Sequence, residues 1–365
     1  MSGSEVSGVE VFEAERARLT GLAYRMLGSI SDAEDVVSEA WLRYQRADPA
    51  MLERPEAWLT TVTSRLAIDR LRAITRRREE YVGPWLPEPV PTGDVPAGTG
   101  LSVTPAPAED PADRVALSES LTLGFLVVLD RLGPVERAVF LLADVFGEPY
   151  ARIADTVGRS EEACRQIASR ARRRVREERA DRAAADESLL ADLVGALVLG
   201  DVDAVLGMLS PDVVLTSDGG PDRHAARRPV IGPDRVARFL INLAGRTPED
   251  ADISIETVNA APALVVRHPE LPVVVAADRD AEGRVIAVRL LLNPVKLGRL
   301  DASFPGICRR RTVRPDRARP PPSGSEAELG LGAGRQVDRL VLQILLEALG
   351  SQLAAEARVL EPAER

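Results

Sequence analysis

Guanidinium and amide side chains recur at helical spacing near the middle of the chain. Residues 159–182 hold nine arginines and five carboxylates, a local charge of +4 in a chain of 365 residues whose net charge is −9. In the major groove of DNA, arginine forms bidentate hydrogen bonds with guanine, and glutamine forms them with adenine. If this segment is a helix, its outward face presents Glu162, Arg165, Gln166, Ser169 and Arg170. The pattern favours DNA binding over the alternative, an ordinary solvated helix face.

A second basic segment lies near the N-terminus. Residues 65–80 hold six arginines and three carboxylates, a local charge of +3. The preceding stretch, 31–47, is instead acidic and contains Trp41. One module thus pairs an acidic, aromatic-bearing helix with a basic one.

The elements around the first basic segment follow a helix-turn-helix plan. We expect a helix over 134–145, a short second helix over 149–156, and a sharp turn at Gly158. Ser160 would then cap the third helix, whose first turn holds Glu161 and Glu162, where the helix dipole favours carboxylates. This layout places the arginine-rich helix where a DNA-reading helix lies.

In the N-terminal module, Ser31 is predicted to cap a helix in a capping box with Glu34. The next helix is predicted to begin after Pro55 and to end at Arg76–Arg78. Eight prolines fall within 84–111, and proline removes backbone donors and restricts the residue before it. That segment is therefore predicted to be a linker.

From Glu187 onward the pattern becomes α+β. We expect one helix over 187–209, another over 233–245, and strands over 213–217, 253–258, 263–267, 273–278 and 284–292. Residues 305–325 are rich in proline and arginine, and 326–358 carry an apolar stripe typical of a helix.

Composition excludes several classes of protein. Two cysteines are too few for a zinc site or a disulfide-stapled domain. No stretch approaches the roughly 18–20 apolar residues that cross a bilayer, and no signal peptide is visible. We therefore expect a soluble cytoplasmic protein with no membrane contact, no metal and no cofactor.

Three segments resemble bacterial RNA polymerase sigma factors. DAEDVVSEAWLRYQRA resembles conserved region 2.2, PEAWLTTVTSRLAIDRLRAITRRR resembles regions 2.3–2.4, and GPVERAVFLLADVFGEPYARIADTVGRSEEACRQIASRARRRV resembles region 4. The absence of a region 3 matches the extracytoplasmic-function class. WLPEP, SDGG and NPVKL resemble motifs of the sigma-J-like group, which carries a C-terminal SnoaL-like domain.

The resemblance implies a multidomain fold. Two all-α modules, a region 2 helical bundle and a region 4 helix-turn-helix, would be followed by an α+β SnoaL-like (NTF2-like) cone domain and a C-terminal helix. The implied boundaries are 1–83 for region 2, 84–113 for the linker, 114–182 for region 4, 186–300 for the SnoaL-like domain and 301–365 for the tail.

The resemblance also implies partners, namely promoter DNA and core RNA polymerase through its β′ clamp helices and β flap. The polymerase-binding positions are Asp32, Asp35, Glu39, Trp41 and Leu42, although Trp41 and Leu42 could instead belong to the module's core. The −10 element would meet Arg65, Asp69, Arg72, Arg76 and Arg77. The −35 duplex would meet Arg165, Gln166, Ser169, Arg170 and Arg173, with phosphates at Arg172, Arg174 and Arg176.

For the C-terminal domain the resemblance implies regulation in cis. The candidate contacts with the sigma modules are Asp218, Gly219, Gly220, Asn293 and Lys296, and ordinary turn chemistry is the alternative for all five. Some SnoaL-like relatives are polyketide cyclases, so a cyclase- or isomerase-type enzyme, or a sensor with a small ligand in its pocket, is the alternative function. The acid–base candidates would be Asp218, Asp222 and His224, but no convergent catalytic set is visible. Cys164 is interpreted as a packing residue, with redox sensing as its alternative.

Overall fold

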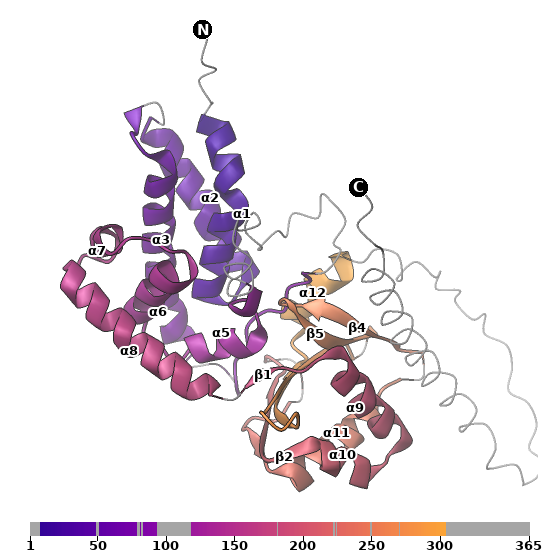
Figure 1. The fold of residues 1–365 in the computed structure, drawn as a ribbon. Coiled ribbons are helices and arrows are strands. Elements are labelled where there is room, and N and C mark those ends of the chain that lie inside the picture. The colour runs from indigo at the N-terminus through magenta and orange to yellow at the C-terminus, as the bar shows by residue number, and fades with distance from the viewer. Residues whose placement is uncertain are drawn as a thin grey trace, which may run out of the picture.

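The chain folds into two helical modules and an α+β domain that pack against one another (Figure 1). The computed structural model describes residues 8–48, 51–78, 81, 83–92, 118–180, 182–221, 223, 225–248, 250–269 and 271–303. The linker residues 93–113, the tail from 304 with its predicted helix 326–358, and Asp222, His224 and Cys308 lie outside these ranges.

The N-terminal module is a bundle of three helices. They are α1 (Gly8–Leu27), α2 (Ile30–Arg46) and α3 (Pro55–Arg78). The prediction that Ser31 caps α2 is wrong, because Ser29 is the capping residue and its hydroxyl accepts from the backbone N–H of Asp32 over 3.4 Å. The physical reason is Gly28, whose positive φ of 68° ends α1 and leaves Ser29 extended, so that the helix already includes residue 31.

The second helical module has the predicted helix-turn-helix layout. Its elements are α5 (Leu123–Leu129), α6 (Pro134–Phe140), the π-helical turn η2 (Leu141–Val145), α7 (Tyr150–Val157) and α8 (Glu161–Arg179). Gly158 adopts the left-handed conformation at φ 65°, and Ser160 accepts from the N–H of Ala163 over 3.2 Å. The turn and the cap that were predicted to orient the third helix are therefore confirmed.

The C-terminal domain contains a seven-stranded mixed sheet. Its strands are β1 (Ala183–Ala184), β2 (Leu209–Asp218), β3 (Val230–Ile231), β4 (Asp252–Val258), β5 (Ala261–Arg267), β6 (Val273–Arg279) and β7 (Val285–Leu291). The order is β3-β2-β7-β6-β5-β4, with β1 paired to β6; only β2 and β7 run parallel.

Helices α9 (Glu187–Leu199), α10 (Val202–Met208), α11 (Pro233–Ala244) and α12 (Pro294–Ser303) complete the domain. The single helix expected over 187–209 is divided into two helices, because Gly200 adopts φ 68° and ends the first. Asp201 caps the second, since its carboxylate accepts a hydrogen bond from the N–H of Ala204 over 3.0 Å.

Both faces of the sheet are covered, by different partners. In β5, Leu264 and Val266 belong to the core that also contains residues of α9 and α11, whereas Val265 packs in a second cluster with Leu86 and Leu123. Alternate residues of a strand point to opposite faces. The second face therefore joins the domain to the helical modules.

The first part of the predicted linker is buried. Residues 83–92, which we call the strap, lie between the helical modules and the sheet, with Leu86 only 2% exposed and Val90 only 1% exposed. Proline has no backbone N–H, so a Pro-rich segment has few donors to satisfy. In the strap, the N–H of Glu88 donates to the carbonyl of Gly28, and the N–H of Thr92 donates to the carbonyl of Thr257. A Pro-rich segment can thus be buried at low cost.

Candidate promoter and polymerase interfaces

The exposed face of α8 carries the residues predicted to read DNA. Cys164, Ala168, Ala171 and Val175 are buried on the opposite side. The exposed set is Arg165, Gln166, Ser169, Arg170 and Arg173. The helix therefore presents the five candidate −35 residues together to solvent.

Local ion pairs hold some of these side chains without covering them. Arg165 pairs with Glu161 over 2.7 Å and lies over the ring of Tyr150 at 5.3 Å. Gln166 donates to Glu162 over 3.2 Å. Exposed pairs of this spacing contribute only about 0.3–0.5 kcal/mol each. DNA bases or phosphates can displace them.

Two of the predicted phosphate contacts are engaged within the protein. Arg172 donates to Asp144 over 2.6 Å and to the hydroxyl of Tyr150 over 2.9 Å, and the hydrogen bond that Asp144 accepts raises the pKa of Arg172. Arg174 lies 3.2 Å from Glu136.

On α3, the candidate −10 residues Arg65, Asp69, Arg72 and Arg76 are exposed, and Arg77 lies in the same helix. Arg72 pairs with Asp69 over 3.0 Å. Arg65 is bound to the other module: its Nε donates to the carbonyl of Thr156 over 3.1 Å, and its Nη2 donates to that of Asp155 over 2.6 Å. These carbonyls belong to the last turn of α7, where a cation is favoured.

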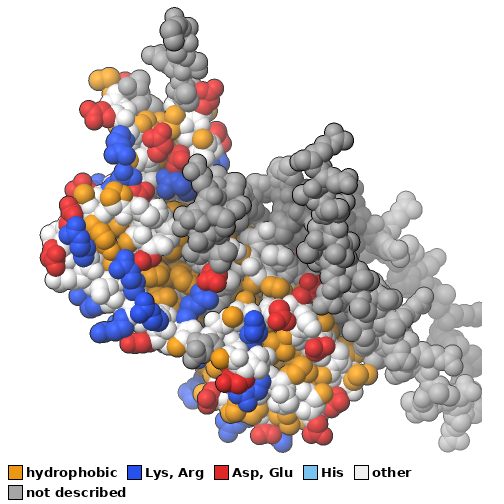
Figure 2. All heavy atoms as spheres, viewed as in Figure 1, with side chains coloured by type: hydrophobic (Ala, Val, Ile, Leu, Met, Phe, Trp, Pro, Cys, Tyr) orange, Lys and Arg blue, Asp and Glu red, His pale blue; other side chains and the backbone are white. Residues whose placement is uncertain are grey.

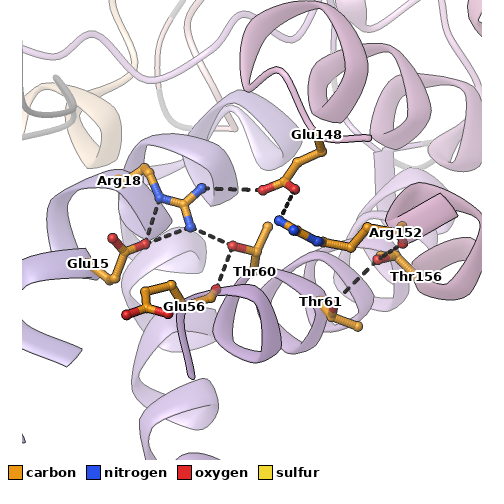
Figure 3. A network of polar contacts seen from close by, with 8 residues as sticks. All are labelled: Glu15, Arg18, Glu56, Thr60, Thr61, Glu148, Arg152 and Thr156. Carbon is orange, nitrogen blue, oxygen red and sulfur yellow. Dashed lines mark hydrogen bonds and ion pairs between the residues drawn. The ribbon is translucent and has the colours of Figure 1, made fainter. Parts of the chain in front are cut away.

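A network of polar side chains extends the contact between the two modules (Figure 3). Arg18 of α1 donates to Thr60 over 2.5 Å and lies 3.9 Å from Glu148, which also pairs with Arg152 of α7. Thr156 donates to Thr61 of α3 over 3.4 Å. The region 4-like module therefore lies on the helix that was predicted to face the −10 element.

The candidate polymerase-binding residues of α2 do not share one environment. Asp32 is half-buried and accepts from Arg70 over 2.7 Å, with Asp35 3.6 Å from the same guanidinium. Trp41 packs in the module, with its ring centroid 4.6 Å from that of Phe12. By contrast, Leu42 is 45% exposed. Glu39 pairs with Arg43 over 2.8 Å.

Three of the five interdomain candidates, Asp218, Asn293 and Lys296, contact the strap or Tyr81, which precedes it. Asp218, 1% exposed, accepts from the hydroxyl of Tyr81 over 2.6 Å, from the N–H of Leu86 over 2.8 Å and from Lys296 over 2.7 Å. Lys296 also donates to the carbonyl of Leu86 and lies 4.1 Å from the ring centroid of Trp85.

Asn293 and the two glycines complete this cluster. Asn293 donates to the Tyr81 hydroxyl over 3.0 Å. A Cβ on Gly220 would lie 2.7 Å from Asn293, and one on Gly219 would lie 2.7 Å from the carbonyl of Arg223. The glycines are thus needed for close approach. The carboxylate of Asp218 and the ammonium group of Lys296 contact the strap, and the amide of Asn293 contacts Tyr81.

Comparison with known proteins agrees with this arrangement. The family model for sigma-70 region 2 matches residues 11–78, and that for sigma-70 region 4 matches residues 124–175. The ECF RNA polymerase sigma factor SigJ of Mycobacterium tuberculosis is 43% identical over 242 residues, which cover 65% of this chain and 73% of SigJ. The chain belongs to the ECF RNA polymerase sigma factors.

Two further similarities extend the match into the C-terminal domain. The probable ECF sigma factor SigI of Mycobacterium tuberculosis is 33% identical over 302 residues, 81% of this sigma factor and 96% of SigI. The crystal structure of Mycobacterium tuberculosis SigJ superposes with a TM-score of 0.61 at 36% identity, covering 80% of this chain and 98% of that one. The expected family and fold class are confirmed. Sigma factors bind core RNA polymerase and promoter DNA, and they are not enzymes.

One residue outside the sites predicted from the sequence joins the C-terminal domain to both helical modules and to the strap. Asn259, fully buried in the β4–β5 turn at φ 53°, donates through Nδ2 to the hydroxyl of Tyr24 over 2.7 Å and to the carbonyl of Leu121 over 3.0 Å. Its Oδ1 accepts from the N–H of Val90 over 2.9 Å. The signal was present, because an asparagine between two strand-like runs tolerates a left-handed turn.

The C-terminal domain also contains a partly open apolar cavity of about 400 Å³ between α9, α11 and strands β4–β6. Thr247 supplies the only polar side chain among the described residues that line it. The acid–base candidate Asp218 is not among them, since it holds the strap.

Neither a metal cluster nor a reactive thiol is visible among the described residues. No group of three or more His, Cys, Asp or Glu side chains there could hold a metal ion, and each helix in those ranges is too short or too polar to cross a bilayer. Cys164 is fully buried, and its burial raises the pKa of the thiol.

Proposed function

We propose that this sigma factor is held in a closed state by its C-terminal domain, and that promoter binding requires the two helical modules to separate. The observation that carries the proposal is the contact of Arg65, a candidate −10 residue, with the last turn of α7 at Asp155 and Thr156.

The geometry of a promoter supports this reading. The −35 and −10 elements are about 25 base pairs apart, which corresponds to about 85 Å of duplex at 3.4 Å per base pair. In the closed state α3 is hydrogen-bonded to α7, which precedes the reading helix α8. One chain cannot place these helices on both elements while that contact persists.

The C-terminal domain supplies the closing contacts. The Asp218–Lys296 pair fixes the start of the strap, and Asn259 binds its end together with Tyr24 of α1 and Leu121 of the second module. Because the strap continues into the chain between the modules, fixing it limits how far they can move apart. The C-terminal domain thus restrains the helical modules of its own chain, and we call this restraint the closed-state brake.

In the open state the residues would act as follows. The exposed part of α2, with Asp35, Glu39 and Leu42, would meet the β′ clamp helices, and the second module would meet the β flap. Arg65, Asp69, Arg72, Arg76 and Arg77 would contact the −10 element, where unstacked bases and phosphates need neutralising partners. Arg165, Gln166, Ser169, Arg170 and Arg173 would read the −35 duplex. This activity places the protein with the polymerase, in the cytoplasm.

The proposal is tested by locking the modules together. The hydroxyl oxygens of Thr61 and Thr156 are 3.4 Å apart, so Thr61→Cys with Thr156→Cys, in a Cys308→Ser background, brings two thiols within reach of a disulfide. We expect the oxidised protein not to initiate transcription with core polymerase, and reduction to restore it. The single variants are the controls. Equal initiation by the oxidised and reduced forms would contradict the closed state.

A second function is favoured by the cavity, namely binding of an uncharged lipophilic molecule rather than catalysis. Its lining offers such a ligand apolar contact, and no charged side chain among the described residues reaches it. Nile red titration is the test: Val194→Trp should abolish a saturable signal, whereas Ser188→Trp, on the exposed side of α9, should keep it. If Val194→Trp left Nile red binding unchanged, the dye would be binding outside this cavity.

A further inference from the structure

A cleft of about 840 Å³ lies where the second helical module meets the C-terminal domain. One wall is formed by the C-terminal half of α8 with Phe125 and Phe140, and the other by Ala183, Ala184 and Ala260. Its volume falls in the range of about 300–1,000 Å³ typical of small-molecule sites. It is separate from the apolar cavity between α9 and α11.

Four arginines converge on this cleft. Arg172, Arg176 and Arg179 are spaced by four and three residues, so they lie on one face of α8, and Arg182 follows the helix. Figure 2 shows Lys and Arg side chains gathered along this side of the helical part. Two carboxylates, Asp144 and Glu119, also line the cleft, so the net charge of its lining is +2, from four arginines and two acids.

The partners of these arginines are unevenly distributed. Arg172 is bound to Asp144 over 2.6 Å, and Arg179 lies over the Phe125 ring at 5.2 Å. Neither Arg176 nor Arg182 pairs with a carboxylate among the described residues. Arg176 lies one helical turn from both Arg172 and Arg179. Like charges at this spacing destabilise each other, so an anion bound beside Arg176 would relieve the repulsion.

This face of α8 lies beside the predicted base-reading face, and its Arg172 and Arg176 are also predicted phosphate contacts of the −35 duplex. At 3.6 residues per turn, the positions 172, 176 and 179 centre roughly a quarter turn away from 165, 166, 169, 170 and 173. They lie between the reading face and the buried face of Cys164 and Ala168. A duplex read by the first face does not have to enter the cleft.

We propose that this cleft is a binding site for a small polyphosphate-bearing molecule, held by Arg176 and Arg182 and flanked by Arg172 and Arg179. Guanidinium groups form charge-assisted, often bidentate, hydrogen bonds with phosphate oxygens. Because the two walls come from the second module and the C-terminal domain, the bound anion would also bridge them. The site requires the second module to be docked on the C-terminal domain, as it is in this structure, but it does not require the helical modules to separate on promoter binding.

Calorimetric titration of the full-length protein with inorganic triphosphate, at about 0.15 M salt and without polymerase, tests this site. We expect saturable binding of one triphosphate per chain, weakened at least tenfold by Arg176→Gln with Arg182→Gln. Each single variant should weaken it in part. The matched control removes two exposed arginines of α11, Arg235→Gln with Arg238→Gln, and should bind as the unaltered protein does.

Titrations with ATP and with a DNA duplex distinguish a nucleotide-sized ligand from nucleic acid. ATP binding at least as tight as triphosphate, and lost in the same variant pair, supports a nucleotide-sized ligand. Absence of saturable triphosphate binding, or equal losses in both variant pairs, would overturn the site in favour of diffuse charge. The proposal is also overturned if Arg176→Gln with Arg182→Gln weakens the binding of a random-sequence DNA duplex but not the binding of triphosphate. Thermal unfolding without ligand verifies that all variants fold.

Discussion

The amide of Asn259 donates to the hydroxyl of Tyr24 over 2.7 Å, although 235 residues separate the two in the chain. Tyr24 in turn donates to the carbonyl of Glu88 in the strap over 2.6 Å. Burial raises the pKa of Tyr24, so the hydroxyl remains a donor at neutral pH. One turn of the C-terminal domain is thereby linked to the first helix of the sigma factor through groups that have no access to water.

Asn259→Ala should loosen this junction. The change leaves the Val90 N–H and the Leu121 carbonyl without their side-chain partner, and each buried group left unsatisfied costs about 1–3 kcal/mol. We expect a lower unfolding midpoint and faster hydrogen exchange in the strap. Asn259→Gly is the control, because it removes the side chain but suits φ 53°. If Ala lowered stability and Gly did not, backbone strain rather than the hydrogen bonds would be the cause.

The sequence was sufficient for the elements whose signals are local. Gly158 and Ser160 specify the turn and the cap before α8, and the apolar run of Cys164, Ala168 and Val175 specifies its buried face. The five candidate −35 residues follow from that face. They could be placed together because helical spacing alone decides which side chains point outward.

Contacts between segments far apart in the chain could not be predicted in this way. Proline content predicted a linker but not what the linker would contact. The strap is buried because Asp218, Lys296 and Asn259 satisfy its polar groups. Likewise, Arg65 lies exposed on α3, the helix on which the sequence placed it, but its bond to the last turn of α7 depends on how the modules pack. No local pattern encodes that packing.

The Asp218–Lys296 pair should couple the C-terminal domain to the strap energetically. In a double-mutant cycle of Asp218→Asn and Lys296→Met, we expect a coupling energy of about 0.5–3 kcal/mol, because the two groups share the Leu86 backbone as partner. The measurement is chemical denaturation of the four proteins. A parallel cycle on the exposed pair Arg43 and Glu39 should give about 0.2–1 kcal/mol. Strictly additive effects at Asp218 and Lys296 would mean that the pair does not hold the strap.

Cys164 should behave as an inert packing residue. It is fully buried, and the raised pKa lowers the fraction of reactive thiolate at neutral pH. In a Cys308→Ser background we expect little alkylation by iodoacetamide in the native protein and complete alkylation in denaturant. Rapid modification of the native thiol would revive the redox-sensor alternative.

Arg165→Ala should relax promoter specificity at one base of the −35 element. Arg165 is exposed on the reading face, and its pairing with Glu161 is weak enough for a base edge to replace. Loss of a base contact costs about 1–3 kcal/mol and lowers discrimination at that position, whereas loss of a phosphate contact weakens all sequences alike and reduces the salt slope by about 1. Arg174→Ala, next to Glu136, is the comparison expected to show the phosphate behaviour. Promoter binding by the polymerase holoenzyme, measured on single-base −35 variants at several salt concentrations, separates the two. Uniform losses from Arg165→Ala would place Arg165 on the backbone and leave base reading to its neighbours on α8.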